Sequence, residues 1–228
     1  AVSAFTAGSG FCGRHDRQLC NPSVSGAERN LGDAMKQEIF EQLKRELCAC
    51  RLCEGKFDHE PRAIFQGAQD ANIMQISQAP SIHVHNSGLP FHDASGKKLR
   101  REWYQIDDAQ FYDEHNFYIA SMGHCYPGKG KQGDKKPPRI CARTWLMREL
   151  DAVDNQLYII IGAMAAKELF PERSFEELVF HDQQLRGKPA LVLPHPSPLN
   201  VRWMKEHPQF EADRLLHIRR LIHRALQL

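Results

Sequence analysis

The 228-residue sequence has no long apolar run and no strong excess of charge of either sign. No stretch approaches the ~18 consecutive apolar residues that a membrane-crossing helix needs, so the sequence predicts no membrane span. Lys and Arg number 30 against 28 Asp and Glu, which gives a formal net charge of +2. That balance permits a polyanionic partner but does not require one.

Two further absences narrow the functional class. The first residues lack a basic region followed by an apolar core, so no signal peptide is expected. The segment from Gly128 to Lys136 is rich in glycine and lysine but lacks the spacing of a P-loop. Its glycines allow backbone amides to approach an anion closely, and Lys129 and Lys131 are candidates for neutralising phosphate. A loop that is merely solvated is the alternative.

The composition is otherwise that of an ordinary globular protein, with 42% hydrophobic and 25% charged residues. The length suffices for one domain with a sizeable core. Seven cysteines, an odd number, without a secretory leader favour a reducing, cytoplasmic compartment. In that setting cysteines more often bind metal or stay free than form disulfides.

The first part of the chain differs from the rest. Residues 1–32 are small, polar and turn-forming with no apolar period, which predicts a disordered N-terminal extension. From Asp33 onward the pattern changes, and residues 33–228 are expected to form one domain. Met35, Ile39, Leu43 and Leu47 recur every four residues, which predicts an amphipathic helix that buries them.

Four short apolar segments alternate with helical patterns along this domain. They lie at 72–76, 117–120, 157–161 and 190–193, and the third is fully apolar and rich in isoleucine. Such alternation is typical of a parallel sheet between helical layers. The sequence therefore predicts an α/β fold, a three-layer α/β/α sandwich with a central, mostly parallel four-stranded sheet.

Four cysteines have spacings that suit a metal centre. Cys50 and Cys53 form a CxxC clamp, Cys125 directly follows a predicted strand, and Cys141 begins a predicted helix. Four thiolates suit either zinc or an iron–sulfur cluster, and both are structural uses of the site. Four unrelated reduced cysteines are the alternative.

Two proline turns follow predicted strands and would lie at the same edge of a parallel sheet. One contains Gln78 and Ala79 before Pro80, and the other holds His195 between two prolines that restrict its backbone. Phe91, between a proline and a histidine, offers an aromatic face. Together these residues predict a pocket for a flat heterocycle at the sheet edge where α/β proteins bind ligands. The alternatives are a histidine that only packs and a phenylalanine that belongs to the core.

The order of these motifs resembles the uracil-DNA glycosylase superfamily, most closely its iron–sulfur (family 4) type. The resemblance covers about residues 47 to 203 and includes the sixteen-residue step from Cys125 to Cys141. It implies a [4Fe-4S] cluster held by Cys50, Cys53, Cys125 and Cys141, with zinc as the alternative. It also implies DNA containing a damaged base as partner, with the target nucleotide flipped into the pocket.

The resemblance carries several roles to positions of this chain. The family's stacking phenylalanine falls on Phe91, its base-contacting turn on Ala79, and its histidine, which stabilises the departing base, on His195. The segment from Ser197 to Trp203 would be the minor-groove loop. Its candidates for entering or contacting the duplex are Ser197, Leu199, Asn200 and Arg202.

Two positions depart from the family pattern. The glutamate of the first turn is replaced by Gln78, and a neutral amide cannot accept a proton from water. The base-reading asparagine is replaced by Ser121, which has one hydroxyl in place of a matched donor and acceptor. Nearby Asp93 is a candidate water-activating carboxylate, and His83, His85 and His92 are candidates to line the cleft.

Two functions follow as alternatives. The first is a monomeric DNA glycosylase acting on a deaminated base, uracil first, with hypoxanthine or xanthine as rivals; His195 and Phe91 favour it. The second is an iron–sulfur nucleic-acid-binding protein that keeps the fold but is catalytically weak or inactive; Gln78 and Ser121 favour it. The sequence leaves open which base is removed and whether single- or double-stranded DNA is preferred.

Overall fold

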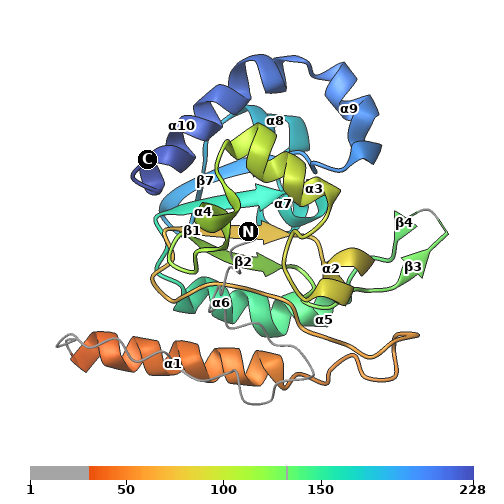
Figure 1. Cartoon of the computed structure of the whole chain (residues 1–228), viewed down its shortest axis with the longest axis vertical. Coiled ribbons are helices and arrows are strands. Elements are labelled where there is room, and N and C mark those ends of the chain that lie inside the picture. The colour runs from red at the N-terminus through yellow and green to blue at the C-terminus, as the bar shows by residue number, and fades with distance from the viewer. Residues whose placement is uncertain (1–30, 132) are drawn as a thin grey trace, which may run out of the picture.

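A computed structural model describes residues 31–131 and 133–228 of the chain (Figure 1). The predicted N-terminal extension, residues 1–32, lies outside the described residues except for its last two, which already belong to the first helix. No helix in the described part of the chain is long and apolar enough to cross a membrane.

The centre of the fold is a five-stranded sheet in the order β2-β1-β5-β7-β6. Its strands are β1 (Ile73–Ser77), β2 (Phe117–Ser121), β5 (Leu157–Ile161), β6 (Gln183–Leu185) and β7 (Lys188–Leu193). The neighbouring pairs β2–β1, β1–β5 and β5–β7 are all parallel, whereas β6 pairs antiparallel with β7. The four predicted strands are confirmed as a parallel sheet.

The prediction of four strands missed the edge strand β6. This strand has only three residues, two of them glutamines, so it carries neither an apolar run nor a clear alternation. By contrast, every residue of β1, β2 and β5 is buried. That pattern is expected of parallel strands covered on both faces, and it is why the sequence identified them.

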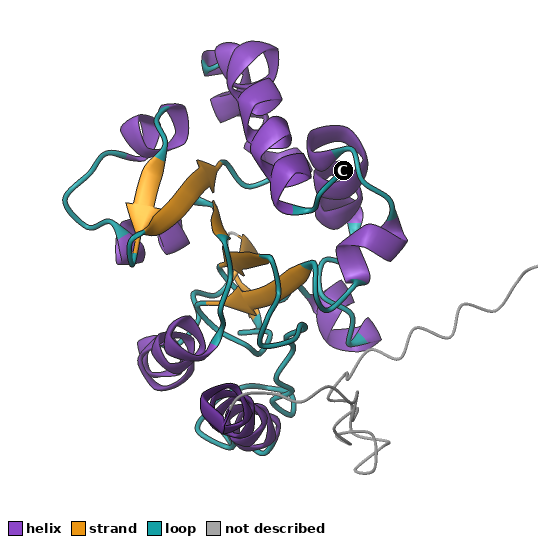
Figure 2. Cartoon of the chain, turned by 90° about the vertical axis from the view of Figure 1, so that its left-hand side faces the viewer, coloured by secondary structure: helices purple, strands orange, loops and turns teal. Residues whose placement is uncertain are grey.

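Helices surround the sheet on both faces, as the two orthogonal views show (Figures 1 and 2). In chain order the helical segments are α1 (Leu31–Cys48), α2 (Ile82–Ser87), α3 (Ala94–Lys97), η1 (Lys98–Tyr104), α4 (Asp108–Tyr112), α5 (Arg139–Cys141), η2 (Ala142–Leu146), α6 (Met147–Ala152), α7 (Ala163–Leu169), α8 (Phe175–Phe180), η3 (Pro198–Asn200), α9 (Val201–Glu206), η4 (Phe210–Arg214) and α10 (Leu215–Ala225). A small antiparallel hairpin, β3 (Lys129–Gly130) and β4 (Gly133–Asp134), projects from the body (Figure 1).

Helix α1 lies outermost, beyond α6 (Figure 1), and contacts it. Only part of its predicted apolar stripe is buried: Leu43 and Leu47 are buried with Phe40, while Met35 and Ile39 are 61% and 58% exposed. The expectation for Met35 and Ile39 was therefore wrong. The four-residue period drifts around the helix, and the buried face follows the 40–43–47 spacing of a 3.6-residue turn instead.

Candidate functional site

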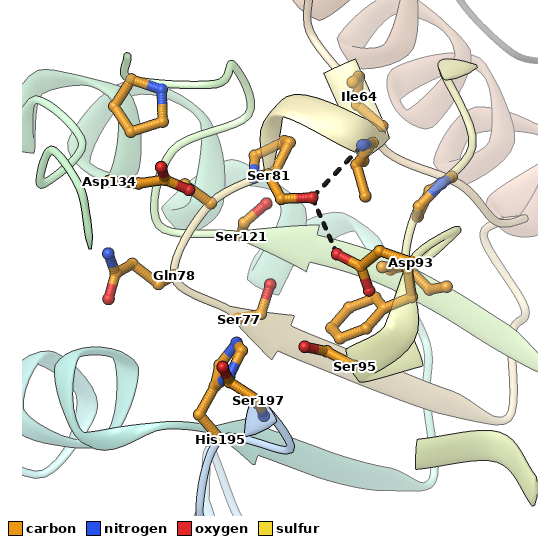
Figure 3. A pocket seen from close by; sticks show the side chains of 17 residues that line it. Ile64, Ser77, Gln78, Ser81, Asp93, Ser95, Ser121, Asp134, His195 and Ser197 are labelled. Carbon is orange, nitrogen blue, oxygen red and sulfur yellow. Dashed lines mark hydrogen bonds between the residues drawn. The ribbon is translucent and has the colours of Figure 1, made fainter. Parts of the chain in front are cut away.

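A cavity of about 310 Å³ opens at the carboxyl edge of the sheet (Figure 3). Its volume falls at the lower end of the range typical of small-ligand sites. The residues that line it belong to β1 and β2, to the turns after β1, β2 and β7, and to neighbouring segments that include α2, α3 and β4: Ile64, Ser77, Gln78, Ala79, Pro80, Ser81, Val84, Pro90, Phe91, Asp93, Ser95, Ile119, Ser121, Pro127, Asp134, His195 and Ser197. The two predicted proline turns and Phe91 therefore meet at one site.

His195 is fixed at the end of β7 by contacts on both its ring and its backbone. The backbone N–H of Ser197 donates to Nδ1 of the ring at 3.1 Å, and the side-chain amide of Asn200 donates to the His195 carbonyl at 3.1 Å. Because Nδ1 accepts a hydrogen bond, the proton of the neutral ring resides on Nε2. The neutral imidazole is therefore a donor through Nε2.

The surroundings of His195 favour this neutral form. Burial lowers the pKa of His195 below its ordinary value of 6.5, and the negative charge of Asp93 offsets part of that effect. Gly162, with φ of +87°, lies against the histidine, and a Cβ there would be 3.7 Å from Cβ of His195. A left-handed glycine thus forms the turn from β5 into α7 beside the ring.

Asp93 is oriented toward the cavity by two hydrogen bonds. Its Oδ1 accepts the backbone N–H of Gly96 at 2.9 Å, which caps α3, and its Oδ2 accepts the hydroxyl of Ser81 at 2.8 Å (Figure 3). Gly96 has no room for a side chain, since a Cβ would lie 1.7 Å from the carbonyl oxygen of Phe91. The carboxylate is thus held on the same wall as the aromatic ring.

Phe91 adopts a left-handed backbone conformation, with φ of +54°. Its carbonyl accepts a hydrogen bond from Arg100 at 2.9 Å, and its ring packs edge-to-face on Phe111 with centroids 6.2 Å apart. Arg100 is only 5% exposed and also donates to Asp108 at 2.9 Å. A non-glycine residue at positive φ is costly and persists where its surroundings impose it, often at functional sites.

The two departures from the family pattern occupy different parts of the cavity. Ser121, 5% exposed, ends β2 beside Ser77 at the inner end of the cavity. Gln78 lies with Asp134 on one side of the opening, whereas Asp93 and Ser95 lie on the other (Figure 3). The Gln78 carbonyl accepts the backbone N–H of Gly123 at 3.0 Å, so the turn that contains Gln78 and Ala79 is tied to the chain after β2.

The segment after His195 forms η3 and α9. Asn200, predicted to enter a duplex, bonds back to His195 and so fixes the turn itself. Arg202 is fully presented to solvent, with a side chain 90% exposed and paired with Glu206 at 2.8 Å. The side chain of Leu199 lies outside the described residues. Ser197 lines the cavity.

The lysine- and glycine-rich loop is the β3–β4 hairpin. Lys129 and Lys131 are exposed, and Lys129 Nζ lies 3.7 Å from Asp134. Asp134 also lines the cavity, and its Oδ1 accepts the Tyr126 hydroxyl at 3.4 Å. The hairpin thus connects an exposed basic surface with the cavity mouth.

Sequence reasoning missed three groups of this site. Ser81 caps α2 and Ser95 lies in the first turn of α3, positions where serine is common for structural reasons alone, so their type did not mark them as cavity residues. Asp134 carried one usable signal, since it is the single acidic residue in a run of glycines and lysines. The prediction that His83, His85 and His92 line the cleft was wrong, because none of them lines the cavity.

The four predicted cysteines line a second, narrower cavity of about 20 Å³. Cys53 and Cys141 are each 7% exposed, and Cys50 and Cys125 are half-buried. Burial together with the neighbouring Cys141, Cys50 and Cys53 raises the pKa of Cys125 to about 12, so the four thiols act on one another. All five cysteines in the described residues are free of disulfides.

Within the same described residues, no three His, Cys, Asp or Glu side chains are arranged to hold a single metal ion. The sulfurs nevertheless receive N–H donors. The Trp145 indole donates to Cys50 Sγ at 3.3 Å, and the His124 backbone N–H donates to Cys141 Sγ at 3.3 Å.

His124 also joins this cavity to a buried carboxylate. Its Nε2 lies 2.9 Å from Oε1 of Glu149, which in turn accepts the Tyr118 hydroxyl at 2.8 Å. Burial alone would lower the pKa of His124, but the Glu149 charge and the Cys141 sulfur raise it to about 10. Sequence reasoning missed both residues, because neither belongs to a recognisable motif.

Comparison with known proteins identifies relatives. The family model described as "Uracil DNA glycosylase superfamily" matches residues 64–219. The chain is 23% identical over 134 residues to a type-4 uracil-DNA glycosylase of Sulfurisphaera tokodaii, covering 58% of this chain and 59% of that protein. It is 25% identical over 136 residues to that of Archaeoglobus fulgidus, covering 58% and 64%. The matches span about three fifths of the length of these relatives.

Proposed function

The chain belongs to the uracil-DNA glycosylase superfamily, and we propose that it hydrolyses the N-glycosidic bond of a deaminated base flipped out of DNA. Uracil is the first candidate, and hypoxanthine and xanthine are the others. The observation that carries the proposal is His195: a half-buried, neutral histidine that is protonated on Nε2 and lines the same cavity as an aromatic ring and a carboxylate.

The chemistry follows from charge development in the transition state. As the glycosidic bond breaks, negative charge accumulates on the departing base and positive charge on the sugar. A fixed Nε2–H donor at a base carbonyl stabilises the first charge, and removing such a donor costs about 10²–10³-fold in rate. Because the Ser197 N–H holds Nδ1, the ring does not need to reorient during the reaction.

Asp93 is the group we assign to water. Its two described hydrogen bonds, from Gly96 and Ser81, leave acceptor capacity on the carboxylate facing the cavity. Gln78 takes the place of the family's glutamate and has no proton-accepting chemistry. The carboxylate of Asp93 therefore replaces it from the opposite wall of the cavity (Figure 3).

The cavity lining is the reason we propose a class of deaminated bases as substrates and not a single base. Phe91 offers a stacking face that accepts any base. The edge of the bound base would face the hydroxyls of Ser77, Ser121 and Ser95, and a hydroxyl can both donate and accept a hydrogen bond. Such a lining does not force the uracil edge pattern in the way an amide would, and this supports hypoxanthine and xanthine as additional substrates.

We propose a [4Fe-4S] cluster at the cysteine cavity, held by Cys50, Cys53, Cys125 and Cys141. The donor set fits: four free thiols around one cavity, two of them already receiving N–H donors, as sulfurs of such clusters do. The bound cluster would clamp the end of α1 to the start of the helix that contains Cys141. Zinc uses the same thiols and is the alternative. Broad absorption near 400 nm in anaerobically prepared protein distinguishes the two, because a zinc-loaded protein is colourless.

DNA contacts are assigned to the rim of the cavity. Ser197, Leu199, Asn200 and Arg202 follow His195, and Arg202 is exposed enough to reach a duplex. Lys129 and Lys131 on the hairpin are suited to phosphate. We propose a monomer that binds damaged DNA with these two segments.

A second candidate function is a nucleic-acid-binding protein with little or no catalysis. The observation that favours it is Gln78, an amide where the family has a carboxylate. It requires that Asp93 serve only as the cap of α3 and the partner of Ser81.

The experiment is a single-turnover assay on oligonucleotides bearing one uracil, hypoxanthine or xanthine, in single- and double-stranded form, with the His195→Ala variant alongside. We expect abasic product from at least one base and a loss of about 10²–10³-fold in the variant. Binding without product from any base would establish the second candidate. Product formed equally well by the variant would exclude the role of His195.

A further inference from the structure

A second groove, larger than the base cavity, adjoins it at Gln78. Its volume is about 650 Å³, against about 310 Å³ for the base cavity. Gln78 lines both, and it lies on the opposite side of the cavity opening from Asp93 (Figure 3). One part of the groove lining comes from residues 136–142, and another comes from α7 and α8. A ligand that fills the base cavity can therefore extend past Gln78 into this groove.

The groove is basic, although the chain as a whole is nearly balanced in charge. Its lining contains one carboxylate, that of Glu168, and four cationic side chains: Lys136, Arg139, Lys167 and Arg173. The whole chain has 30 Lys and Arg against 28 Asp and Glu. All four cations are exposed, so they form the rim of the groove. Such a local excess of positive charge attracts an anionic ligand.

The four cations differ in the contacts that they already make. Lys167 Nζ donates to a backbone carbonyl just after α7 at 3.0 Å, and Arg173 pairs with Glu177 at 2.8 Å. Lys136 and Arg139, by contrast, have no hydrogen bond or ion pair within the part of the chain that the structure describes. These two cations can therefore bind a phosphate without losing an internal contact.

Below the rim the groove is apolar. Its floor consists of buried or half-buried side chains, among them those of Met122, Pro137, Met164, Phe175 and Leu178. Pro137 packs so closely on Gly123 that a Cβ at the glycine would lie 2.3 Å from the Cβ of Pro137. The N–H of Gly123 donates to the Gln78 carbonyl at 3.0 Å. The groove and the turn of the base cavity are therefore held in a fixed relation.

An apolar floor beneath a basic rim suits single-stranded nucleic acid, whose bases pack on side chains while its phosphates contact cations. We propose that the groove binds a nucleotide that flanks the flipped one in an unpaired DNA strand, with its base on the floor and its phosphate at Lys136 and Arg139. This inference rests on the proposed DNA substrate. It assigns to the protein a preference for an unpaired flank on one side of the target, because a paired base cannot reach the floor.

The test measures the binding of oligonucleotides that carry a deoxyuridine stabilised against cleavage by a 2′-fluorine. The unpaired flank is lengthened on the 5′ side in one series and on the 3′ side in another, and a fully paired duplex is the comparison. Fluorescence anisotropy gives the affinity over a range of about 50–200 mM salt. We expect an unpaired flank on one side, and not on the other, to strengthen binding by at least about 5-fold over the duplex.

Three variants separate the rim from the floor. Lys136→Gln/Arg139→Gln should reduce the slope of log K against log salt by about 1.4, since each phosphate contact of a single strand contributes about 0.7. Met164→Gln makes the floor more polar without changing the charge, so it should weaken binding of the unpaired flank at an unchanged slope. Arg220→Gln/Arg224→Gln is the matched control, because it removes the same charge from exposed positions of α10, which lines neither the groove nor the base cavity.

Three results would overturn the inference: an affinity that does not depend on the unpaired flank, a salt slope that the rim variant and its control change equally, or wild-type affinity in Met164→Gln. Base release is measured separately, in the single-turnover assay. Base release together with flank-independent binding would refute this inference and leave the proposed function intact. Flank-dependent binding without base release would refute the proposed activity and leave the groove assignment intact.

Discussion

The base cavity and the cysteine cavity are lined by neighbouring residues of the chain, Ile64 in the first and Ala63 in the second, yet they are built in opposite ways. The first is about 310 Å³, open, and lined by hydroxyls, two carboxylates and an imidazole. The second is about 20 Å³ and lined by thiols, mostly apolar side chains and His124. The base cavity is suited to admitting and polarising a ligand, whereas the cysteine cavity is suited to holding a small group rigidly.

The two cavities differ in the contacts that hold their side chains in place. In the cysteine cavity, N–H groups of Trp145 and His124 donate to the sulfurs of Cys50 and Cys141 and fix those side chains. In the base cavity the side chains are held by backbone features: the proline-flanked His195, the left-handed Phe91 and the cap at Asp93. Substitutions in one cavity should therefore leave the other largely unchanged, and four predictions test that separation.

The largest effect is expected from Cys141→Ser, which removes a proposed cluster ligand whose side chain is 7% exposed. Iron content should fall to near zero, and the thermal midpoint should drop by at least ~5 °C, because each kcal/mol lost lowers it by roughly 2–4 °C in a chain of this size. Iron analysis and calorimetry measure both. Cys48→Ser, next to the cavity but not lining it, is the control and should retain its iron. Full iron retention in Cys141→Ser would remove the cofactor assignment.

Asp93→Asn comes next. Asparagine still caps α3, so the loss is confined to the negative charge, and the single-turnover rate of base release should fall by about 10²-fold with iron content unchanged. Asp134→Asn is the matched control, because this carboxylate lines the opposite side of the cavity (Figure 3). If the control lost as much activity as Asp93→Asn, the water-activating role would belong to neither residue specifically.

Phe91→Ala should weaken substrate use by between about 5- and 150-fold, the range for one base stacked on one aromatic ring. The effect should appear in binding of damaged oligonucleotides, measured by fluorescence anisotropy, and should be similar for uracil and hypoxanthine. Phe170→Ala, an aromatic residue outside the cavity lining, is the control. Unchanged affinity in Phe91→Ala would place the base elsewhere.

The smallest expected effect is a shift in the pKa of His195. Burial lowers the pKa of His195 and Asp93 raises it in part, so Asp93→Asn should lower it further, as measured by NMR of the ring. The folded state binds fewer protons than the unfolded state here, so the stability contributed by His195 is complete above pH ~6.5 and is lost as pH falls through the lower folded value. A higher pKa in Asp93→Asn would contradict the described environment.

The sequence predicted the parallel strands because they are buried along their whole length, and it predicted His195 and Phe91 because prolines punctuate those turns. It could not predict β6, which is held by pairing with β7 and not by its own pattern. The roles of Arg100, His124 and Glu149 were not predicted, for a related reason. Their roles depend on contacts with residues 9, 17 and 31 positions away, to Phe91, Cys141 and Tyr118 respectively, and spacing along the chain does not reveal such contacts.

The central claim is that a flipped base enters the cavity against Nε2–H of His195. The most direct measurement is the ¹⁵N spectrum of the His195 ring at pH 7, with and without a duplex bearing a deoxyuridine whose glycosidic bond is stabilised by a 2′-fluorine. We predict a neutral ring protonated on Nε2 in the free protein, and a shift of that nitrogen when the duplex binds. A ring protonated on Nδ1, or a spectrum that binding leaves unchanged, would contradict the account.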